Sequence, residues 1–116
     1  MYYLGEHITT MALLCSTKNF SDDSAKGFTL NDTGYVVVKK DGLFYVYINR
    51  CPHIGINLEY QPNQFLDIEN HYIQCSNHGA LFEIETGTCV SGPCTGQSLT
   101  NVPFDLIDSA IHLQGD

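Results

Sequence analysis

The sequence predicts a small all-β domain. It contains seven tyrosines and six phenylalanines but no tryptophan, and aromatic and β-branched residues favour strands. The stretch GYVVVKKDGLFYVYINR (34–50) has two β-rich runs around Asp41-Gly42, a dipeptide that tolerates the positive φ angles of a tight hairpin turn. The length of 116 residues is near the commonest size of a single domain. We therefore expect an all-β fold with one core.

Further strands are expected on both sides of this hairpin. Thr86-Gly87 and Asp108-Ser109 supply turns between some of them. The stretch 58–70 has no clean period and contains a proline, so it predicts a loop with at most one helical turn. The expected strands are 11–15, 27–30, 72–75, 80–84, 88–90, 100–107 and 110–114.

The N-terminus differs from the rest of the chain. Residues 1–11 end at a second methionine, Met11, and we expect a flexible extension there, followed by a single domain over 12–116. The start has no basic region of a secretory signal, and no run of 18 apolar residues occurs. These features predict a soluble cytoplasmic protein that does not span a membrane.

The charge limits the classes of partner. A net charge of −8 argues against a nucleic-acid partner, because phosphates are neutralised by lysine and arginine. An acidic surface is common among soluble domains, and it would also steer the protein toward a basic protein partner.

Two short stretches carry the chemistry: CPHIG (51–55) and CSNHG (75–79). Each offers a cysteine and a histidine and closes on a glycine, which lets the backbone turn tightly. Within each stretch the two side chains are too close in sequence to serve separate sites. We therefore expect one metal site that takes Cys51, His53, Cys75 and His78 as ligands.

Thiolate and imidazole suit zinc or an iron–sulfur cluster, and not calcium or magnesium. Zinc modules usually have both cysteines before both histidines, whereas here the order alternates. This order favours two distinguishable metals, one held by two thiolates and the other by two imidazoles, as in a Rieske-type [2Fe-2S] centre. A zinc-bound interaction module is the remaining alternative.

These residues resemble the Rieske-type [2Fe-2S] ferredoxin family. CPHIG and CSNHGALFEIETG are similar to its two ligand loops, and SGP (91–93) is similar to its proline loop. The resemblance implies an antiparallel β-sandwich with the cluster-binding loops at the tip. It also implies that Cys51 and Cys75 bind one iron, that His53 and His78 bind the other, and that Gly92-Pro93 shields the cluster.

The same resemblance implies a function. The expected protein is a soluble electron carrier, not an enzyme by itself, that moves one electron between a reductase and a terminal oxygenase or related redox enzyme. The alternative within the family is a small or regulatory subunit of a larger oxidoreductase, as in nitrite reductases.

Departures from the respiratory cytochrome bc branch point to the ferredoxin-like branch. That branch has one more cysteine in each ligand loop, where this chain has Ile56 and Asn77, so the inter-loop disulfide cannot form. It also has a serine and a tyrosine that donate hydrogen bonds to sulfur, where this chain has Ala80 and Phe82. Without these donors, we expect a potential toward the low end of the Rieske range, roughly −150 to +300 mV.

The remaining cysteines and histidines have simpler interpretations. Cys89 and Cys94 bracket VSGP; we expect two thiols, with a disulfide or a redox sensor as the alternative. Cys15 is expected to be a small buried apolar residue. Glu83 and Glu85 are expected to be solvated, or to belong to a docking surface. The histidines expected to serve in packing or at the surface are His7, His71 and His112.

Overall fold

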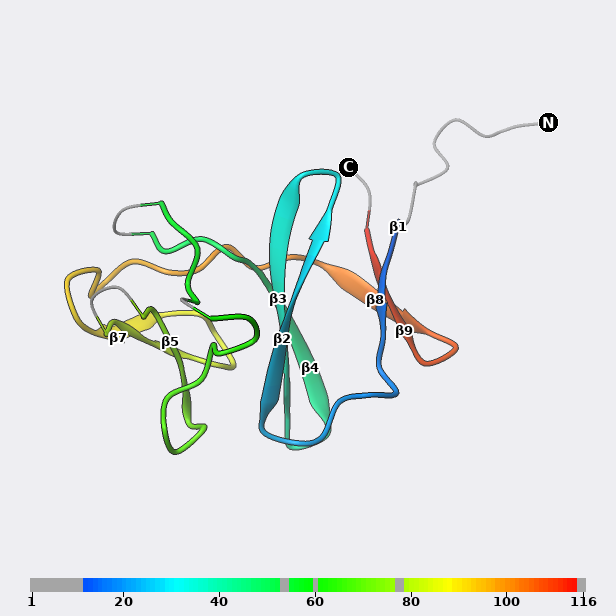
Figure 1. Cartoon of the computed structure of the whole chain (residues 1–116), viewed down its shortest axis with the longest axis horizontal. Coiled ribbons are helices and arrows are strands. Elements are labelled where there is room, and N and C mark those ends of the chain that lie inside the picture. The colour runs from blue at the N-terminus through cyan, green and yellow to red at the C-terminus, as the bar shows by residue number, and fades with distance from the viewer. Residues whose placement is uncertain (1–11, 53–54, 60, 77–78, 115–116) are drawn as a thin grey trace. The chain divides into compact units, whose positions relative to one another are not determined.

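The computed structural model describes residues 12–52, 55–59, 61–76 and 79–114 (Figure 1). In these ranges the secondary structure consists of strands arranged in three antiparallel sheets, with no helix. The all-β prediction is therefore confirmed. The expected extension over residues 1–11 lies outside the described residues. By internal packing, the chain divides into two compact units, Phe20–Val102 and the two terminal segments taken together.

The first sheet of the Phe20–Val102 unit contains the predicted hairpin. Strands β2 (Ser24–Leu30), β3 (Thr33–Lys40) and β4 (Leu43–Ile48) form it in the order β2-β3-β4. Asp41 and Gly42 have φ angles of 53° and 79°, as a tight turn requires. The hairpin prediction is therefore confirmed, and β4 leads within three residues to Cys51.

The turn between β2 and β3 was not predicted from the sequence. Asn31 and Asp32 form it with φ angles of 52° and 67°. Asparagine and aspartate tolerate this left-handed conformation better than other non-glycine residues. The Asn31-Asp32 pair between two β-rich runs could have predicted this turn from the sequence.

The second sheet carries the second ligand loop. Strands β5 (Tyr72–Gln74), β6 (Leu81–Glu83) and β7 (Cys89–Ser91) form it in sequence order. The predicted strands at 72–75, 80–84 and 88–90 correspond to these three. Between the first sheet and β5, no helical turn occurs in the described part of 58–70.

The core of this unit is shared by the two sheets. Val36 and Val38 of β3 lie in the same buried group as Ile73 of β5 and Phe82 of β6. The same group includes four cysteines, Cys51, Cys75, Cys89 and Cys94. The cysteine-bearing turns are therefore anchored directly in the hydrophobic core.

The predicted strand 100–107 is divided at Pro103. Before the proline, the backbone pairs with β4: Ile48 N–H donates to Thr100 C=O, and Val102 N–H donates to Val46 C=O, both at 2.9 Å. After the proline, β8 (Phe104–Ile107) belongs to the other unit. Proline has no N–H to continue a strand ladder, so a break at this residue follows from its chemistry.

The second unit is a three-stranded sheet of the terminal segments. Strands β1 (Ala12–Ser16), β9 (Ala110–Leu113) and β8 pair in the order β1-β9-β8. The predicted turn at Asp108-Ser109 connects β8 to β9, with φ angles of 52° and 61°. Cys15, expected to be a buried apolar residue, is 9% exposed. That residues 12–116 form a single domain stays a prediction.

The described residues include no helix with the length and apolar character needed to span a membrane.

Candidate metal centre

The first cysteine loop is closed by two backbone hydrogen bonds. Cys51 N–H donates to Ile56 C=O at 2.7 Å, and Gly55 N–H donates back to Cys51 C=O at 2.7 Å. Gly55 has a φ angle of 74°, which a residue with a Cβ adopts only at a cost. The glycine four residues after the cysteine therefore allows the chain to reverse and return beside it.

The second cysteine loop repeats this geometry. Cys75 N–H donates to Ala80 C=O at 2.9 Å, and Gly79 N–H donates to Cys75 C=O at 2.8 Å. Gly79 has a φ angle of 69°. The two stretches that stood out in the sequence thus fold into matching turns, each with its cysteine at the start.

A third turn has the same hydrogen bonds but no candidate ligand. Glu83 N–H donates to Thr88 C=O at 2.9 Å, and Gly87 N–H donates to Glu83 C=O at 2.7 Å. This type of turn therefore occurs in this unit both with and without a cysteine at its start. What distinguishes the two cysteine loops is the chemistry of their first residue and its burial.

Both thiols are buried. Cys51 is 1% exposed and Cys75 is 0% exposed, and both belong to the same core group. His53 and His78, the other two predicted ligands, lie outside the described residues. Among the described residues, no group of three or more histidine, cysteine, aspartate or glutamate side chains could bind a metal ion. The four-residue ligand set stays a prediction.

Hydrogen bonds tie the two cysteine loops together. Ser76, directly after Cys75, donates to Leu58 C=O from both its N–H and its Oγ, each at 2.9 Å. Leu58 is fully buried and lies just beyond the end of the first loop. The backbone of one loop is therefore fixed relative to that of the other.

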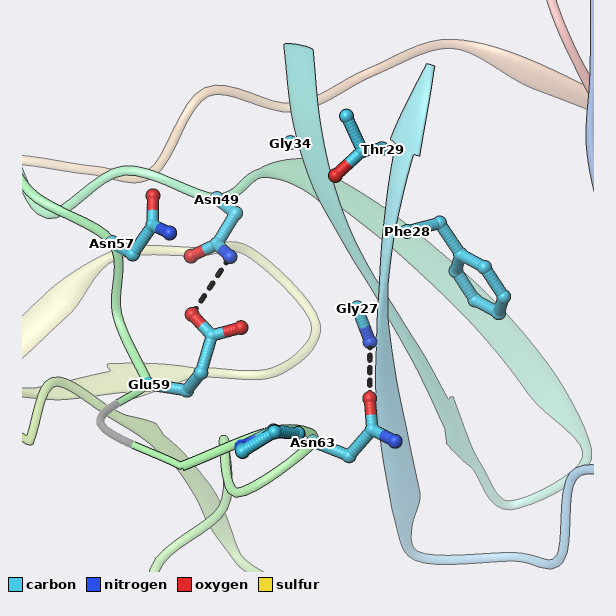
Figure 2. Close-up of a pocket in the computed structure, with 9 residues that line it drawn as sticks. Gly27, Phe28, Thr29, Gly34, Asn49, Asn57, Glu59 and Asn63 are labelled. Carbon is cyan, nitrogen blue, oxygen red and sulfur yellow. Dashed lines mark hydrogen bonds between the residues drawn. The ribbon is translucent and has the colours of Figure 1, made fainter. Parts of the chain in front are cut away.

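Asn49 is a buried positioning residue that the sequence analysis missed. Its Oδ1 accepts a hydrogen bond from Leu58 N–H at 2.8 Å, and its Nδ2 donates to Glu59 Oε1 at 2.9 Å (Figure 2). These bonds join Asn49, two residues before Cys51, to the segment that follows the first loop. Asn49 also lines an open pocket of about 360 Å³. An isolated asparagine has no sequence pattern that would have revealed this role.

The proline loop packs against the second cysteine loop through Gly92. A Cβ placed on Gly92 would lie 2.8 Å from Ala80 Cα, and Gly92 has a φ angle of 104°. Only glycine allows the two backbones to approach this closely. The structure thus brings the SGP stretch next to the turn that begins at Cys75.

Two further cysteines flank the proline loop. All five cysteines of the chain are present as thiols, and Cys94 Sγ donates to Cys89 Sγ at 3.0 Å. Burial raises the pKa of the Cys94 thiol to about 12, with contributions from the hydrogen bond to Cys89 and from the negative charge of the Cys89 and Cys51 thiolates.

The two positions expected to lack hydroxyl groups are buried beside the second loop. Ala80 and Phe82 are each 0% exposed. Ile56, which stands where the respiratory branch has a cysteine, is 44% exposed. Asn77, its expected counterpart, and Ile54, another residue of the first stretch, lie outside the described residues.

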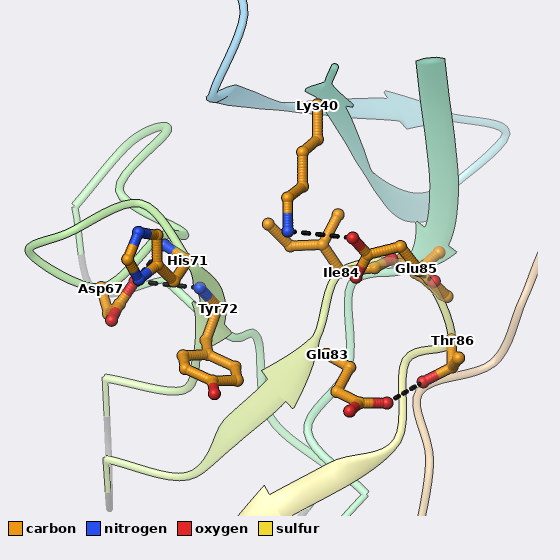
Figure 3. Close-up of polar contacts among 9 residues, drawn as sticks. Lys40, Asp67, His71, Tyr72, Glu83, Ile84, Glu85 and Thr86 are labelled. Carbon is orange, nitrogen blue, oxygen red and sulfur yellow. Dashed lines mark hydrogen bonds and ion pairs between the residues drawn. The ribbon is translucent and has the colours of Figure 1, made fainter. Parts of the chain in front are cut away.

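The acidic residues at the end of β6 and just after it make local contacts (Figure 3). Glu85 pairs with Lys40 at 2.9 Å; this bond lowers the pKa of the glutamate and raises that of the lysine. Glu83 Oε1 accepts a hydrogen bond from Thr86 Oγ1 at 2.9 Å. Both carboxylates thus belong to the surface network of the third turn, where solvated side chains were expected.

The other histidines behave as surface or packing residues where they are described. His71 is exposed, with its Nδ1 3.6 Å from Glu69 Oε1. Its backbone N–H and that of Tyr72 both donate to Asp67 Oδ1 (Figure 3). His112 is half-buried on β9, and His7 lies outside the described residues.

Comparison with protein families agrees with this geometry. Residues 10–106 match the family described as "Rieske [2Fe-2S] domain". The chain belongs to the Rieske [2Fe-2S] domain family. The cofactor of this family is a [2Fe-2S] cluster.

Solved structures share the fold of this Rieske domain. The ferredoxin of carbazole 1,9a-dioxygenase from Nocardioides aromaticivorans IC177 is similar with a TM-score of 0.73 at 18% identity, over 92% of this chain and 99% of that one. The ferredoxin of Sphingomonas yanoikuyae B1 is similar with a TM-score of 0.73 at 23% identity, over 92% and 100%. At these identities the likeness establishes the fold, including its antiparallel architecture.

One curated relative is much longer. Cholesterol 7-desaturase of Caenorhabditis elegans is 27% identical over 81 residues, which is 69% of this chain but only 18% of that protein. This Rieske domain therefore corresponds to less than a fifth of the length of the desaturase.

The described residues fit the cluster of the family. A [2Fe-2S] cluster needs cysteine thiolates as ligands, and the structure presents two buried thiols at equivalent places in two matching turns. Hydrogen bonds between the turns fix their relative placement. The two thiols are therefore presented from turns that are tied to each other.

Proposed function

We propose that this Rieske domain is an electron carrier whose [2Fe-2S] cluster is bound by Cys51, His53, Cys75 and His78. The observation that carries the proposal is the pair of matching turns, each beginning with a buried cysteine. Both turns lie inside the matched family region. Each turn contains one histidine, so each supplies one ligand of each kind.

The chain's own residues would hold and insulate the cluster. Cys51 and Cys75 provide thiolates from the core side, where water is excluded. Asn49, Ser76 and Leu58 keep the two turns in register. When bound, a Rieske cluster stores and releases one electron, with the imidazoles lowering the negative charge around one iron.

The surroundings of the thiols favour a low potential. Ala80 and Phe82 are buried near the second turn and have no hydroxyl to donate. Hydrogen bonds to cluster or cysteine sulfur would stabilise the more negative reduced form. We therefore place the potential toward the lower part of the Rieske range, roughly −150 to +300 mV.

The partners we propose are a reductase and a terminal oxygenase. Support comes from the fold shared with a ferredoxin of a carbazole dioxygenase over nearly the full length of both chains. The net charge of −8 would favour partners with basic docking surfaces. We propose a cytoplasmic location, where the cysteines outside the cluster would stay mostly reduced. A small subunit of a larger oxidoreductase is the second candidate, because such subunits use the same domain.

Electron paramagnetic resonance of the dithionite-reduced protein tests the ligand set. Nitrogen ligation changes the His-bound iron, so the expected average g value is below that of an all-cysteine cluster. His53→Cys and His78→Cys should each shift this signal, because each replaces nitrogen by sulfur. Cys51→Ser and Cys75→Ser should lose most of the visible absorption. His71→Cys is the matched control, since this exposed histidine lies outside both turns, and its spectrum should equal that of the unchanged protein.

Three outcomes would contradict the proposal. Identical spectra for the unchanged protein and for both ligand-loop histidine variants would remove the histidines from the site. A colourless, iron-free protein that binds zinc instead would establish the interaction module. A red-brown protein that copurifies with a large catalytic subunit, and exchanges electrons only inside that complex, would establish the subunit alternative.

A further inference from the structure

Cys89 and Cys94 form a thiol pair that the proposed electron-transfer site does not use. Their sulfur atoms are 3.0 Å apart, and their side chains are 2% and 1% exposed. A disulfide has a sulfur–sulfur bond of about 2.0 Å, so bond formation requires a further approach of only about 1 Å.

The backbone of the proline loop already holds the two cysteines together. Cys89 N–H donates to Gln97 C=O, and Gln97 N–H donates to Cys94 C=O, both at 2.8 Å. Thr95 Oγ1 donates to Gly92 C=O at 2.7 Å. Because the loop is closed without a covalent bond, little additional chain entropy is lost when the sulfurs join.

The pair lies beneath an exposed segment. Every residue from Val90 to Pro93 is exposed, as are Thr95 and Gly96. Val90, the residue next to Cys89, is 43% exposed. A small displacement of this loop would therefore open the sulfurs to a small reagent without opening the rest of the core.

We propose that Cys89 and Cys94 are a redox modification site that forms a reversible disulfide with low-molecular-weight disulfides such as oxidised glutathione. Cys89 attacks the small disulfide first, because burial and the hydrogen bond to Cys89 keep Cys94 protonated; a mixed disulfide forms at Cys89 and one small thiolate leaves. Cys94 then loses its proton, attacks the Cys89 sulfur of the mixed disulfide and releases the second small thiolate. Overall, two electrons pass to the small disulfide, the two protein protons end on the two released small thiols, and one bond joins Cys89 to Cys94.

The bond would clamp the proline loop against the second cysteine loop. Gly92 lies between the two cysteines in sequence, and its backbone packs on Ala80. A bond between Cys94 and Cys89 would restrict the motion of Gly92, because Gly92 lies in the short loop that the bond closes. The chemistry of this pair does not depend on a bound cluster, so it can be tested separately from the electron-transfer proposal.

The test uses the full chain as purified and a protease that cleaves after glutamate. The fragment that begins at Thr86 contains Cys89 and Cys94 and no other cysteine. The protein is equilibrated with oxidised glutathione, and its remaining thiols are blocked with a maleimide in denaturant. After digestion, the mass of the fragment is measured by mass spectrometry. We expect a fragment that carries no maleimide and is two hydrogens lighter than the dithiol. Dithiothreitol treatment before blocking should restore two maleimides.

Two controls separate the native pair from chance oxidation. At a fixed ratio of reduced to oxidised glutathione, the equilibrium ratio of disulfide to dithiol should be about tenfold or more lower in denaturant, because only the fold gives the pair a high effective concentration. Cys94→Ser should leave Cys89 as a glutathione adduct or a maleimide adduct, whereas Cys15→Ser should leave the result unchanged. Two maleimides on the fragment after equilibration with excess oxidised glutathione would overturn the proposal. Equal ratios of disulfide to dithiol in native and denatured protein would also overturn it.

Discussion

Tyr47 links the two sheets of the Phe20–Val102 unit through a single polar atom. It lies on β4 and is fully buried, and its hydroxyl donates to Ile84 C=O at 2.6 Å. Removing the hydroxyl would leave a buried carbonyl without a donor. The free-energy cost of that unsatisfied group is larger than the net stability that the hydrogen bond contributes. The aromatic ring also packs under Gly87, where a Cβ would lie 2.8 Å from Tyr47 Cε1.

Tyr47→Phe should lower the free energy of unfolding by about 1–3 kcal/mol, because it leaves the Ile84 carbonyl without its donor. Urea denaturation followed by circular dichroism measures the change. Tyr45→Phe is the matched control on the same strand; among the described residues its hydroxyl has no hydrogen-bond partner, and the expected change is within about 0.5 kcal/mol. Equal losses in the two variants would assign the effect to the ring and not to the hydrogen bond.

The same hydroxyl should make the protein sensitive to alkaline pH. Burial raises the pKa of Tyr47 to about 12, helped by the negative charge of Tyr45 and Glu85, whereas an unfolded tyrosine titrates near 10. The folded state therefore keeps its proton where the unfolded state loses it. Stability from this group is complete below about pH 10 and is lost as pH rises to about 12.

The free energy of unfolding, measured from about pH 9 to about pH 12, checks this expectation, because this range includes the pKa values of the unfolded and the folded tyrosine. The unchanged protein should lose stability more steeply over this range than Tyr47→Phe, which cannot titrate there. Parallel pH profiles for the two proteins would show that Tyr47 ionises equally in the folded and unfolded states.

At the scale of elements, the turns decide where the chemistry lies. Three turns with the same hydrogen bonds begin at Cys51, Cys75 and Glu83, and each uses a glycine with positive φ four residues later. Two of them place a cysteine in the core, and the third places a glutamate at the surface. The same backbone turn can therefore present different side chains, and the identity of its first residue determines whether the turn offers a buried thiol or a surface carboxylate.

The proline loop offers a test of close packing between elements. Gly92→Ala and Gly96→Ala both put a Cβ on a residue with positive φ, at 104° and 93°. At Gly92 the new atom would lie 2.8 Å from Ala80 Cα, whereas at Gly96 no atom lies within 4 Å. Backbone strain of about 1–2 kcal/mol is expected in both, and overpacking of roughly 1–3 kcal/mol only at Gly92.

Thermal or urea unfolding of the two variants measures this difference. The Gly92 variant should be the less stable, and it should lose its visible absorption faster in the presence of an iron chelator, since its loop is displaced from the Cys75 turn. If the Gly96 variant is affected as much as the Gly92 variant, strain alone explains both and the contact with Ala80 is unimportant.

At the scale of the whole molecule, sequence patterns predicted most of the strands and drew attention to the two turns that begin at Cys51 and Cys75. The Asp41-Gly42 hairpin, the turn at Asp108-Ser109 and the strands around Cys75 are all present. These features depend on local preferences: tolerance of positive φ, β propensity and short spacing. The strand expected at 100–107 was wrong in extent: Pro103 interrupts it, and residues 100–102 pair with β4, a partner more than 50 residues away.

Local spacing in the sequence determined the family, the two cysteine turns and the choice of metals they suit, because those properties reside in neighbouring residues. Only the tertiary structure decided that Asn49 supports the first loop, that Gly92 meets Ala80, and that the Cys89 and Cys94 sulfurs touch in a buried site. Contacts of this kind form between segments that the core brings together. Their energies depend on distances of a few tenths of an ångström, which no residue pattern encodes.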